Sequence, residues 1–424
     1  MLNRVIVIFL LTAVIPVFSA KTEADEINDL KNQIKTMQRQ LINMQKKLEE
    51  LELKNNPQGQ VSEKPDNQIV PMGKKDTMDD SDNILKTIKG AHLELGGELE
   101  LEYVDTEKDA SIAKPESHFQ IDTFYLYPKI TFKEINLVLK GDLAFKPGET
   151  YVEELHARFS GLPGDAWVEA GLNDMFIANI DRKTEAEILV ETAFYRSDDI
   201  GIMIGGSPVN WFYWRASVTN GLKLSRKGPG EDSAYQMIHD ARNTGDSGGM
   251  MLGAGLGIKS ELKGFGKFDL MPFYYRGSLS SADVTFLQAV NGYGSYMDDD
   301  KERYGLNARY DVSNFTLIAQ YIEAQDGRME RNGWFIQPSY RINPFKTDLF
   351  SGYEFVYRYN TLDVGLENMP ADSLTWDREQ HIFSIITDIY KNIKLKTEYY
   401  INDEDTGADD VDNNEFLMQL EIIF

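Results

Sequence analysis

The chain has 424 residues with 44 Lys and Arg against 68 Asp and Glu, which gives a net charge of −24, and it contains no Cys. The absence of Cys excludes a disulfide scaffold, a Cys-ligated zinc site and a thiol nucleophile. The excess of acid argues against a nucleic-acid partner, because binding a phosphate backbone requires clustered Lys and Arg. No GxSxG, HExxH, GxGxxG or P-loop motif occurs, so we predict no catalytic residues, no metal site and no cofactor.

Residues 1–20 have the order of a secretory signal peptide. One basic residue, Arg4, is followed by an apolar run from Val5 to Val17 and by the small residues Ser19 and Ala20. The apolar run is shorter than the roughly 20 residues that a membrane-spanning helix needs. We therefore predict an exported protein, with an uncleaved N-terminal anchor as the alternative.

Residues 25–54 carry apolar side chains at alternating intervals of three and four, which is typical of a coiled-coil seam. The positions between them are polar, so the helix buries its apolar stripe only by pairing with other chains. We expect oligomerisation, with dimer and trimer both open, and a lone helix lying on the following domain as the alternative. Residues 55–89 lack periodicity and are rich in Asn, Pro and Gly, which predicts a flexible linker. The seam consists of Ile27, Leu30, Ile34, Met37, Leu41, Met44, Leu48 and Leu51.

Residues 90–424 alternate between apolar and polar side chains with a period of two. In the last segment, Phe416, Met418 and Leu420 share one face, while Gln419 and Glu421 share the other. Carboxylates facing a packed core would each cost several kcal/mol unless paired, whereas carboxylates facing water inside a barrel cost little. We therefore expect one face of these strands to meet lipid and the other to meet water.

Sixteen segments of this kind can be distinguished, and the connections between them alternate between tight turns and long polar loops. Three of the predicted tight turns contain proline, at Leu162-Pro163-Gly164-Asp165, Ser207-Pro208 and Asn343-Pro344. This organisation is typical of an all-β, 16-stranded antiparallel transmembrane barrel of the bacterial outer membrane, here at residues 90–424. A soluble, secreted all-β protein is the alternative. The predicted strands are 91–105, 118–133, 135–146, 150–160, 166–174, 199–206, 209–219, 249–262, 267–277, 302–312, 314–325, 331–342, 347–360, 376–390, 393–403 and 413–424.

Four local pieces occur in an order that resembles the phosphate-selective porin O and P family. They are Glu169-Ala170-Gly171-Leu172, Phe194-Tyr195-Arg196, Gly205-Gly206 and Val218-Thr219-Asn220-Gly221. The resemblance covers residues 90–424 and implies a trimeric outer-membrane porin whose connector after the fifth strand folds into the lumen. It extends to relatives with a periplasmic coiled coil, and Phe424 is similar to the terminal signal that the barrel assembly machinery recognises. Phosphate-selective members line the pore with an arginine ladder. Here no run of Arg recurs on one face at a regular height, so anion selectivity is not carried over.

Two charged arcs are predicted on the inner wall when the more polar face of each strand is taken as lumenal. Facing each other across a narrow pore, they would create a transverse field that selects ions. The alternative is that these are solvated lumen charges without a selective role. The basic arc consists of Arg303, Arg309, Arg341, Arg358, Lys394 and Lys396, and the acidic arc of Glu94, Glu98, Glu100, Glu102, Glu415 and Glu421.

The long connector at residues 175–198 is the predicted constriction. Its acidic bias favours cations or neutral solutes over anions. Two further acidic clusters, 298–300 and 403–412, are expected in loops, either as solvated charges or as holders of divalent cations that bridge lipopolysaccharide. The constriction residues are Asp181, Arg182, Lys183, Glu185, Glu187, Glu191 and Arg196.

The sequence thus predicts a homo-oligomeric outer-membrane porin, with a water-filled channel for passive diffusion of small hydrophilic solutes or ions. Its expected partners are outer-membrane lipid, lipopolysaccharide and the barrel assembly machinery. One alternative is a phosphate-specific or other anion-specific channel. Another is a structural envelope tether in which the barrel is only an anchor.

Overall fold

The computed structural model describes residues 91–106, 117–178, 180–195, 198–227, 237–245, 249–291, 299–344, 350–366, 374–405, 411 and 413–424. The predicted signal peptide, the coiled coil with its seam residues and the linker all lie outside the described residues. Within the described part of the chain, no helix has the length and apolar character that crossing a membrane requires.

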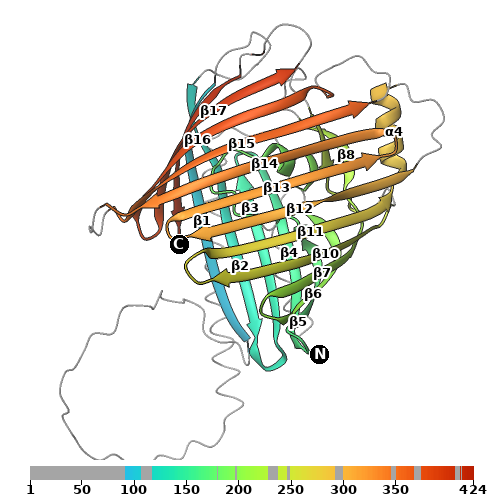
Figure 1. Ribbon diagram of the computed structural model, residues 1–424, viewed down its shortest axis with the longest axis horizontal. Helices are drawn as coiled ribbons and strands as arrows, with labels where there is room; N and C mark the ends of the chain where they lie inside the picture. Colours follow the sequence, from blue (N-terminus) through green and yellow to red (C-terminus); the bar gives the residue numbers. More distant parts are fainter. Residues whose placement is uncertain are drawn as a thin grey trace, which may run out of the picture. The chain divides into compact units, whose positions relative to one another are not determined.

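Sixteen strands form a closed antiparallel barrel, as predicted (Figure 1). Strands that follow one another in the barrel are hydrogen-bonded neighbours, and the first and last strands pair to close it. The strands are β1 (Ala91–Thr106), β2 (Ser117–Phe132), β3 (Leu137–Lys146), β4 (Glu149–Leu162), β5 (Ala166–Asn173), β6 (Asp199–Val209), β7 (Phe212–Thr219), β10 (Met251–Leu262), β11 (Gly266–Ser278), β12 (Asp300–Val312), β13 (Phe315–Asp326), β14 (Met329–Ile342), β15 (Gly352–Leu366), β16 (Asp377–Tyr390), β17 (Ile393–Asp405) and β18 (Glu415–Ile423).

The two faces of the barrel wall differ in exposure along each strand. On β10, Leu252, Leu256 and Ile258 point outward and are exposed, while Met251 at the start of the strand points inward and is buried. An apolar outer face of this kind is stable when it contacts lipid rather than water. The period of two therefore separates an apolar outside from an inside, as the sequence predicts.

The C-terminal residue completes the barrel. The backbone N–H of Phe424 donates to the carbonyl oxygen of Gly97 on β1, and the N–H of Gly97 donates to the carbonyl oxygen of Phe424, both at 2.9 Å. The Phe424 ring stacks on Phe124 of β2, with ring centroids 5.9 Å apart. A Cβ atom at Gly97 would lie 2.5 Å from the Phe424 ring, so the glycine leaves room for this ring.

The connections depart from the predicted alternation of tight turns and long loops. On the side of the barrel with the long loops, β3–β4 and β13–β14 are joined by two-residue turns, at 147–148 and 327–328. The turn predicted at Ser207-Pro208 instead lies at 210–211, and Pro208 belongs to β6. A shift of register between Gly206 and Val209 accommodates Pro208, which has no N–H to donate to the neighbouring strand.

Several long loops contain secondary structure that the sequence analysis does not anticipate. The connector after β5 contains helix α3 (Leu189–Phe194), and the loop after β7 contains a hairpin of β8 (Lys223–Lys227) and β9 (Met237–Ala241). Helix α4 (Ser281–Asn291) follows β11, and a short 3₁₀ helix, η1 (Lys133–Ile135), forms the turn between β2 and β3. The long loop that the sequence predicts between the strands 209–219 and 249–262 therefore holds a hairpin with buried apolar residues.

An apolar core fills one side of the interior. It joins inward side chains of β10, β11, β13 and β14 to residues of the connector and of the β8–β9 hairpin. On β10 and β11 both faces are apolar, so the rule that the lumenal face is the more polar one does not describe these strands. The core includes Phe176, Ile177, Val190, Phe194, Leu224, Ile238, Met271, Phe273, Tyr275, Ile318, Ile322 and Phe335.

Candidate functional site

The connector after β5 lies inside the barrel. Inward-facing amide side chains of β12, β14 and β15 bond to its backbone, so the connector runs along the wall formed by these strands. Backbone groups removed from water need such partners, because each one left unpaired costs free energy. The bonds run from Asn307 Nδ2 to the Ile177 carbonyl at 3.1 Å, from Gln337 Nε2 to the Asp181 carbonyl at 3.1 Å, and from the Leu189 N–H to Asn360 Oδ1 at 2.8 Å.

Two buried charges hold the tip of the connector, which consists of residues 185–187. Arg358 of β15, fully buried, donates to the carbonyl oxygens of Ala186 and Glu187. Glu398 of β17, 1% exposed, accepts the backbone N–H groups of Glu185 at 3.0 Å and of Ala186 at 3.2 Å. Glu398 also accepts hydroxyl bonds from Ser384 and Tyr400. The tip is therefore fixed to the wall by a cation on its carbonyl side and an anion on its N–H side.

The predicted constriction residues mostly bond to the connector itself or to the wall beside it. Arg182 pairs with Glu191 at 3.4 Å and with Glu185 at 3.8 Å. Lys183 pairs with Glu354 of β15, and the Thr192 hydroxyl donates to Glu187 at 2.8 Å. Opposite charges around the Arg182 guanidinium raise its pKa above the usual value, although burial opposes this. Arg196 lies outside the described residues.

A buried cluster of two arginines and two aspartates fixes the β8–β9 hairpin to the wall. Arg303 of β12 and Arg331 of β14 each contact both Asp240 of β9 and Asp326 of β13, and all four are at most 1% exposed. Arg331 also donates to the Ala193 carbonyl of α3 at 3.0 Å. Burial alone would raise the pKa of Asp240, but the two guanidinium groups hold that pKa below its usual value.

The two predicted arcs adjoin each other at β17 and β18. Glu421 of the acidic arc pairs with Lys394 at 2.7 Å and Lys396 at 2.8 Å, both members of the basic arc. The reason is the strand order, because β17, β18 and β1 are neighbours in the closed barrel. Lys396 also pairs with Glu185 of the connector at 3.3 Å.

The rest of the basic arc is also compensated. Arg309 pairs with Asp311 at 2.8 Å and with Asp181 at 3.5 Å. Arg341 pairs with Asp388 of β16. Together with Arg303 and the lysines, these residues form carboxylate pairs, whereas Arg358 bonds to carbonyl oxygens. The basic arc therefore does not present a row of bare positive charge to the pore.

The acidic arc differs because its central members on β1 lack a cationic partner. Glu98 accepts a bond from the Tyr127 hydroxyl, and Glu102 accepts bonds from the amides of Gln120 and Gln419. Among the described residues, neither carboxylate nor that of Glu100 has a Lys, Arg or His nitrogen within 4.0 Å. At the ends of the arc, Glu94 pairs with Lys129 at 2.7 Å and Glu415 accepts a bond from Thr106 at 3.0 Å.

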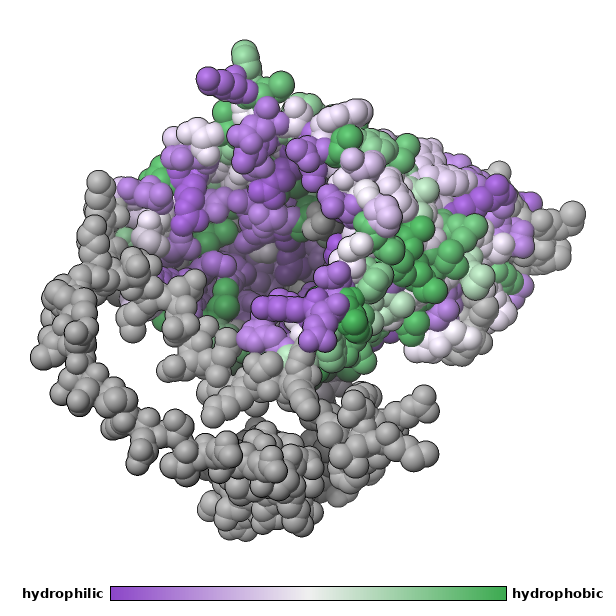
Figure 2. Space-filling view, turned by 90° about the horizontal axis from the view of Figure 1, so that it is seen from below, coloured by the Kyte–Doolittle hydropathy of each residue, from purple (hydrophilic) through white to green (hydrophobic). Residues whose placement is uncertain are grey.

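The surface view agrees with an open, polar region beside the filled one. Figure 2 looks into one end of the barrel and shows a hollow lined mainly by hydrophilic residues. Several inward charges of the wall are partly exposed, including Lys129 at 45% and Arg341 at 43% of the side chain. This contrasts with Arg303 and Arg331, which the connector and the hairpin cover.

A row of stacked cations and aromatic rings was missed at the sequence level. Arg158 of β4 lies 4.2 Å from the Trp167 ring centroid, and Arg215 of β7 lies 5.1 Å from both the Trp167 and Tyr213 rings. Arg303 and Arg331 were likewise not recognised as neighbours, although both pair with Ala324 of β13 in register. The sequence does give one signal for Arg331, since it shares parity with Arg341 on the same strand.

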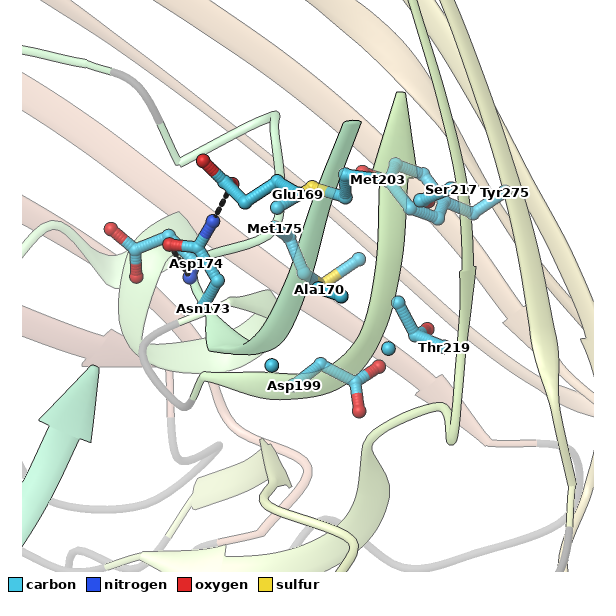
Figure 3. Close-up of a pocket in the computed structure, with 12 residues that line it drawn as sticks. Glu169, Ala170, Asn173, Asp174, Met175, Asp199, Met203, Ser217, Thr219 and Tyr275 are labelled. Atoms are coloured by element: carbon cyan, nitrogen blue, oxygen red, sulfur yellow. Dashed lines mark hydrogen bonds between the residues drawn. The ribbon is translucent and has the colours of Figure 1, made fainter. Parts of the chain in front are cut away.

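A small cavity lies where the connector leaves the wall, between β5, β6, β7 and β11 (Figure 3). Its volume of about 10 Å³ holds about one water molecule. Asn173 bonds to Glu169 at its rim, and the buried Asp199 accepts the N–H groups of Ile200 at 2.8 Å and Gly221 at 3.0 Å. We therefore assign this cavity a structural role, where the connector joins the wall, and not a role in ligand binding.

Comparison with solved structures identifies the fold. The chain is similar to the outer-membrane channel DcaP of Acinetobacter baumannii, with 12% identity and a TM-score of 0.54, covering 80% of this chain and 99% of that one. It is similar to OmpF of Salmonella typhi in a complex with daunomycin, with 15% identity, a TM-score of 0.54, and 79% and 98% covered. It is also similar to an anion-selective porin of Comamonas acidovorans, with 11% identity, a TM-score of 0.52, and 79% and 100% covered.

No protein-family model and no curated protein sequence matches the chain. The resemblance to the phosphate-selective porin O and P family therefore stays a prediction. What the solved structures establish is the fold: a 16-stranded porin-like β-barrel.

Proposed function

We propose that this chain is an outer-membrane porin whose water-filled channel passes small hydrophilic solutes and ions, with a preference for cations. The observation that carries the cation preference is the set of β1 carboxylates, Glu98, Glu100 and Glu102, which face the interior without a cationic partner among the described residues. Charged rings at the narrow part of a pore select ions of the opposite sign. The basic side chains of the wall pair with carboxylates or carbonyls, so they attract a permeating anion less strongly than unpaired cations would.

In this proposal, the connector forms the constriction of the channel. It lies inside the barrel along β12–β15, and its tip reaches β17 and β18, where Lys396 and Glu421 lie. Solutes would pass between this connector and the wall of β1–β4. A connector held at both its carbonyl and N–H groups gives the pore a defined width.

We further propose that the chain is a trimer in the bacterial outer membrane, with the predicted coiled coil in the periplasm. The exposed apolar outer face of the barrel supports contact with outer-membrane lipid. Phe424 is available at the closing strand as a signal for the barrel assembly machinery, with 58% of its surface exposed. Lipopolysaccharide is the expected neighbour of the long loops. Trimer and periplasmic coiled coil rest on the family resemblance and on the heptad pattern.

Conductance in planar bilayers tests the channel and its selectivity. We expect open steps and, in a salt gradient, a reversal potential of the sign that indicates cation preference. The triple variant E98Q/E100Q/E102Q should lower the cation-to-anion permeability ratio by about threefold or more, because three uncompensated charges are removed near the path. The matched control is the double variant K129M/E94Q, which removes a carboxylate of the same strand and face together with its cationic partner and should leave the permeability ratio unchanged.

Three outcomes would contradict the proposal. Anion preference in the unaltered protein would favour the anion-specific alternative. An unchanged permeability ratio in the triple variant would show that the β1 carboxylates do not select ions. A folded barrel that conducts nothing would favour the envelope tether.

A further inference from the structure

Three carboxylates from distant parts of the chain converge at the tip of the connector. They belong to Glu100 of β1, Asp122 of β2 and Glu185 of the connector, and one oxygen from each lies within 4.8 Å of the others. β1 and β2 are adjacent strands, whereas Glu185 reaches them from the loop that is anchored on β15 and β17. The cluster is therefore the place where the connector tip meets the β1–β2 part of the wall, next to β18 and β17.

Glu100 is the member that the protein leaves unsatisfied. Only 7% of its surface is exposed, and among the described residues it makes no hydrogen bond and no ion pair. Its carboxylate oxygen points into the cluster, close to the oxygens of Asp122 and Glu185. A buried carboxylate without a partner is costly, and like charges at this distance add to the cost.

Neighbouring cations do not balance this charge. Lys146 lies 3.6 Å from Asp122. Lys396 and Arg182 lie 3.3 Å and 3.8 Å from Glu185, but Lys396 also pairs with Glu421 and Arg182 also pairs with Glu191. Glu98 and Glu102 flank Glu100 on the same face of β1 and add two more carboxylates without an ion pair. The site thus has an excess of negative charge, and a cation from solution would remove it.

The ligand set suits calcium better than magnesium, because Ca²⁺ accepts about six to eight oxygens in flexible geometry, whereas Mg²⁺ demands a near-ideal octahedron and gives up its waters reluctantly. Two oxygens on opposite sides of one Ca²⁺, each about 2.4 Å from the ion, lie about 4.8 Å apart. The oxygens of the cluster fall within this limit without any movement. Waters from the lumen would complete the coordination of the larger ion.

We propose that Glu100, Asp122 and Glu185 bind one Ca²⁺ ion that joins the tip of the connector to the β1–β2 wall. This inference deepens the proposed function, because the ion would occupy the same acidic wall that selects cations. It also attaches the tip of the connector to β1 and β2, in addition to the strands that carry Arg358 and Glu398. Millimolar Ca²⁺ is then expected to lower the channel current, because the ion holds the tip against the wall and offsets the charge that attracts other cations.

Calorimetric titration of CaCl₂ into the full chain, folded in detergent micelles, tests the site. We expect one site per chain that E100Q abolishes or weakens at least about tenfold, with a dissociation constant in the unaltered protein near that of weak extracellular calcium sites, about 0.1–1 mM. E94Q is the matched control, because Glu94 has the same side chain on the same face of β1, about 20 Å away along the strand. It should bind Ca²⁺ like the unaltered protein.

D122N is a second variant, used with E100Q so that misfolding of one does not decide the result. Heat-dependent mobility on gels verifies that each barrel is folded. The proposal is overturned when the unaltered protein shows no saturable site, when both variants bind like the unaltered protein, or when E94Q loses the site equally. Calcium binding to acidic loops that persists in both variants, with no site lost, also overturns it.

The calcium-binding test and the conductance test can each fail independently of the other. A barrel that conducts nothing but has an E100Q-sensitive calcium site would refute the proposed channel and retain the site. A cation-preferring channel whose Ca²⁺ binding ignores E100Q and D122N would retain the channel and refute the site.

Discussion

Two regions of the same lumen differ in whether their charged side chains have partners. On the side of β12–β15, the connector and the hairpin cover the wall, and Arg303, Arg331 and Arg358 are almost fully buried with every charge paired or bonded. On β1, the carboxylates of Glu98, Glu100 and Glu102 point toward the interior without a cationic partner among the described residues. A buried ion pair costs desolvation and fixes the geometry of the elements that it joins, whereas a carboxylate without a cationic partner is available to a cation from solution. The difference separates the residues that shape the pore from those that face its solutes.

Disrupting the buried cluster of two arginines and two aspartates should have the largest effect on stability. D326N removes one of the two anions between Arg303 and Arg331 and leaves positive charge buried without compensation. We expect about 3–5 kcal/mol of destabilisation, the usual cost of removing one partner of a buried ion pair. Thermal unfolding in detergent micelles measures it, with the loss of heat-modifiable mobility as the readout.

D300N is the matched control for D326N. Asp300 also pairs with an arginine, Arg276, but both side chains are more than half exposed. We expect no measurable change in the unfolding temperature. Equal effects of the two variants would mean that the buried cluster does not stabilise the protein more than a surface pair does.

The anchor of the connector tip should come next in size. E398Q replaces a carboxylate that accepts two backbone N–H groups and two hydroxyls by an amide with a single acceptor oxygen. Losing charge-assisted bonds of this kind costs about 1.5–3 kcal/mol each. Because the cost falls on the tip, we expect a noisier single-channel current with brief closures and a smaller fall in thermal stability than in D326N.

S384A serves as the milder comparison for E398Q. It removes only one hydroxyl from the Glu398 carboxylate and leaves both connector N–H bonds in place. Quiet, full-size current steps are expected. Noise equal to that of E398Q would imply that the tip is held by something other than the carboxylate.

The sequence predicts the strands of the barrel wall better than the connector and the hairpin that occupy the interior. A period of two gives the strand number and places Glu421 and Arg303 inward, because any strand between lipid and water must alternate. It does not give the partners of Arg303, since Asp240 comes from a hairpin that a polar loop composition conceals. Nor does it give the site at Glu100, because Glu185 lies 85 positions further along the chain and reaches it only through the bonds of Arg358 and Glu398.

The smallest effect on stability, and the sharpest test of the comparison, is expected at Lys129. Its ammonium pairs with Glu94 at 2.7 Å, and both side chains are more than 40% exposed. Solvent screening limits such a pair to about 0–1 kcal/mol, so K129M should leave the unfolding temperature nearly unchanged. It nevertheless frees the Glu94 carboxylate on the open wall, so the reversal potential should shift further toward cation preference. The double variant K129M/E94Q removes both charges and should return the permeability ratio to that of the unaltered protein, whereas a shift that persists would assign the effect to the added methionine and not to the freed charge.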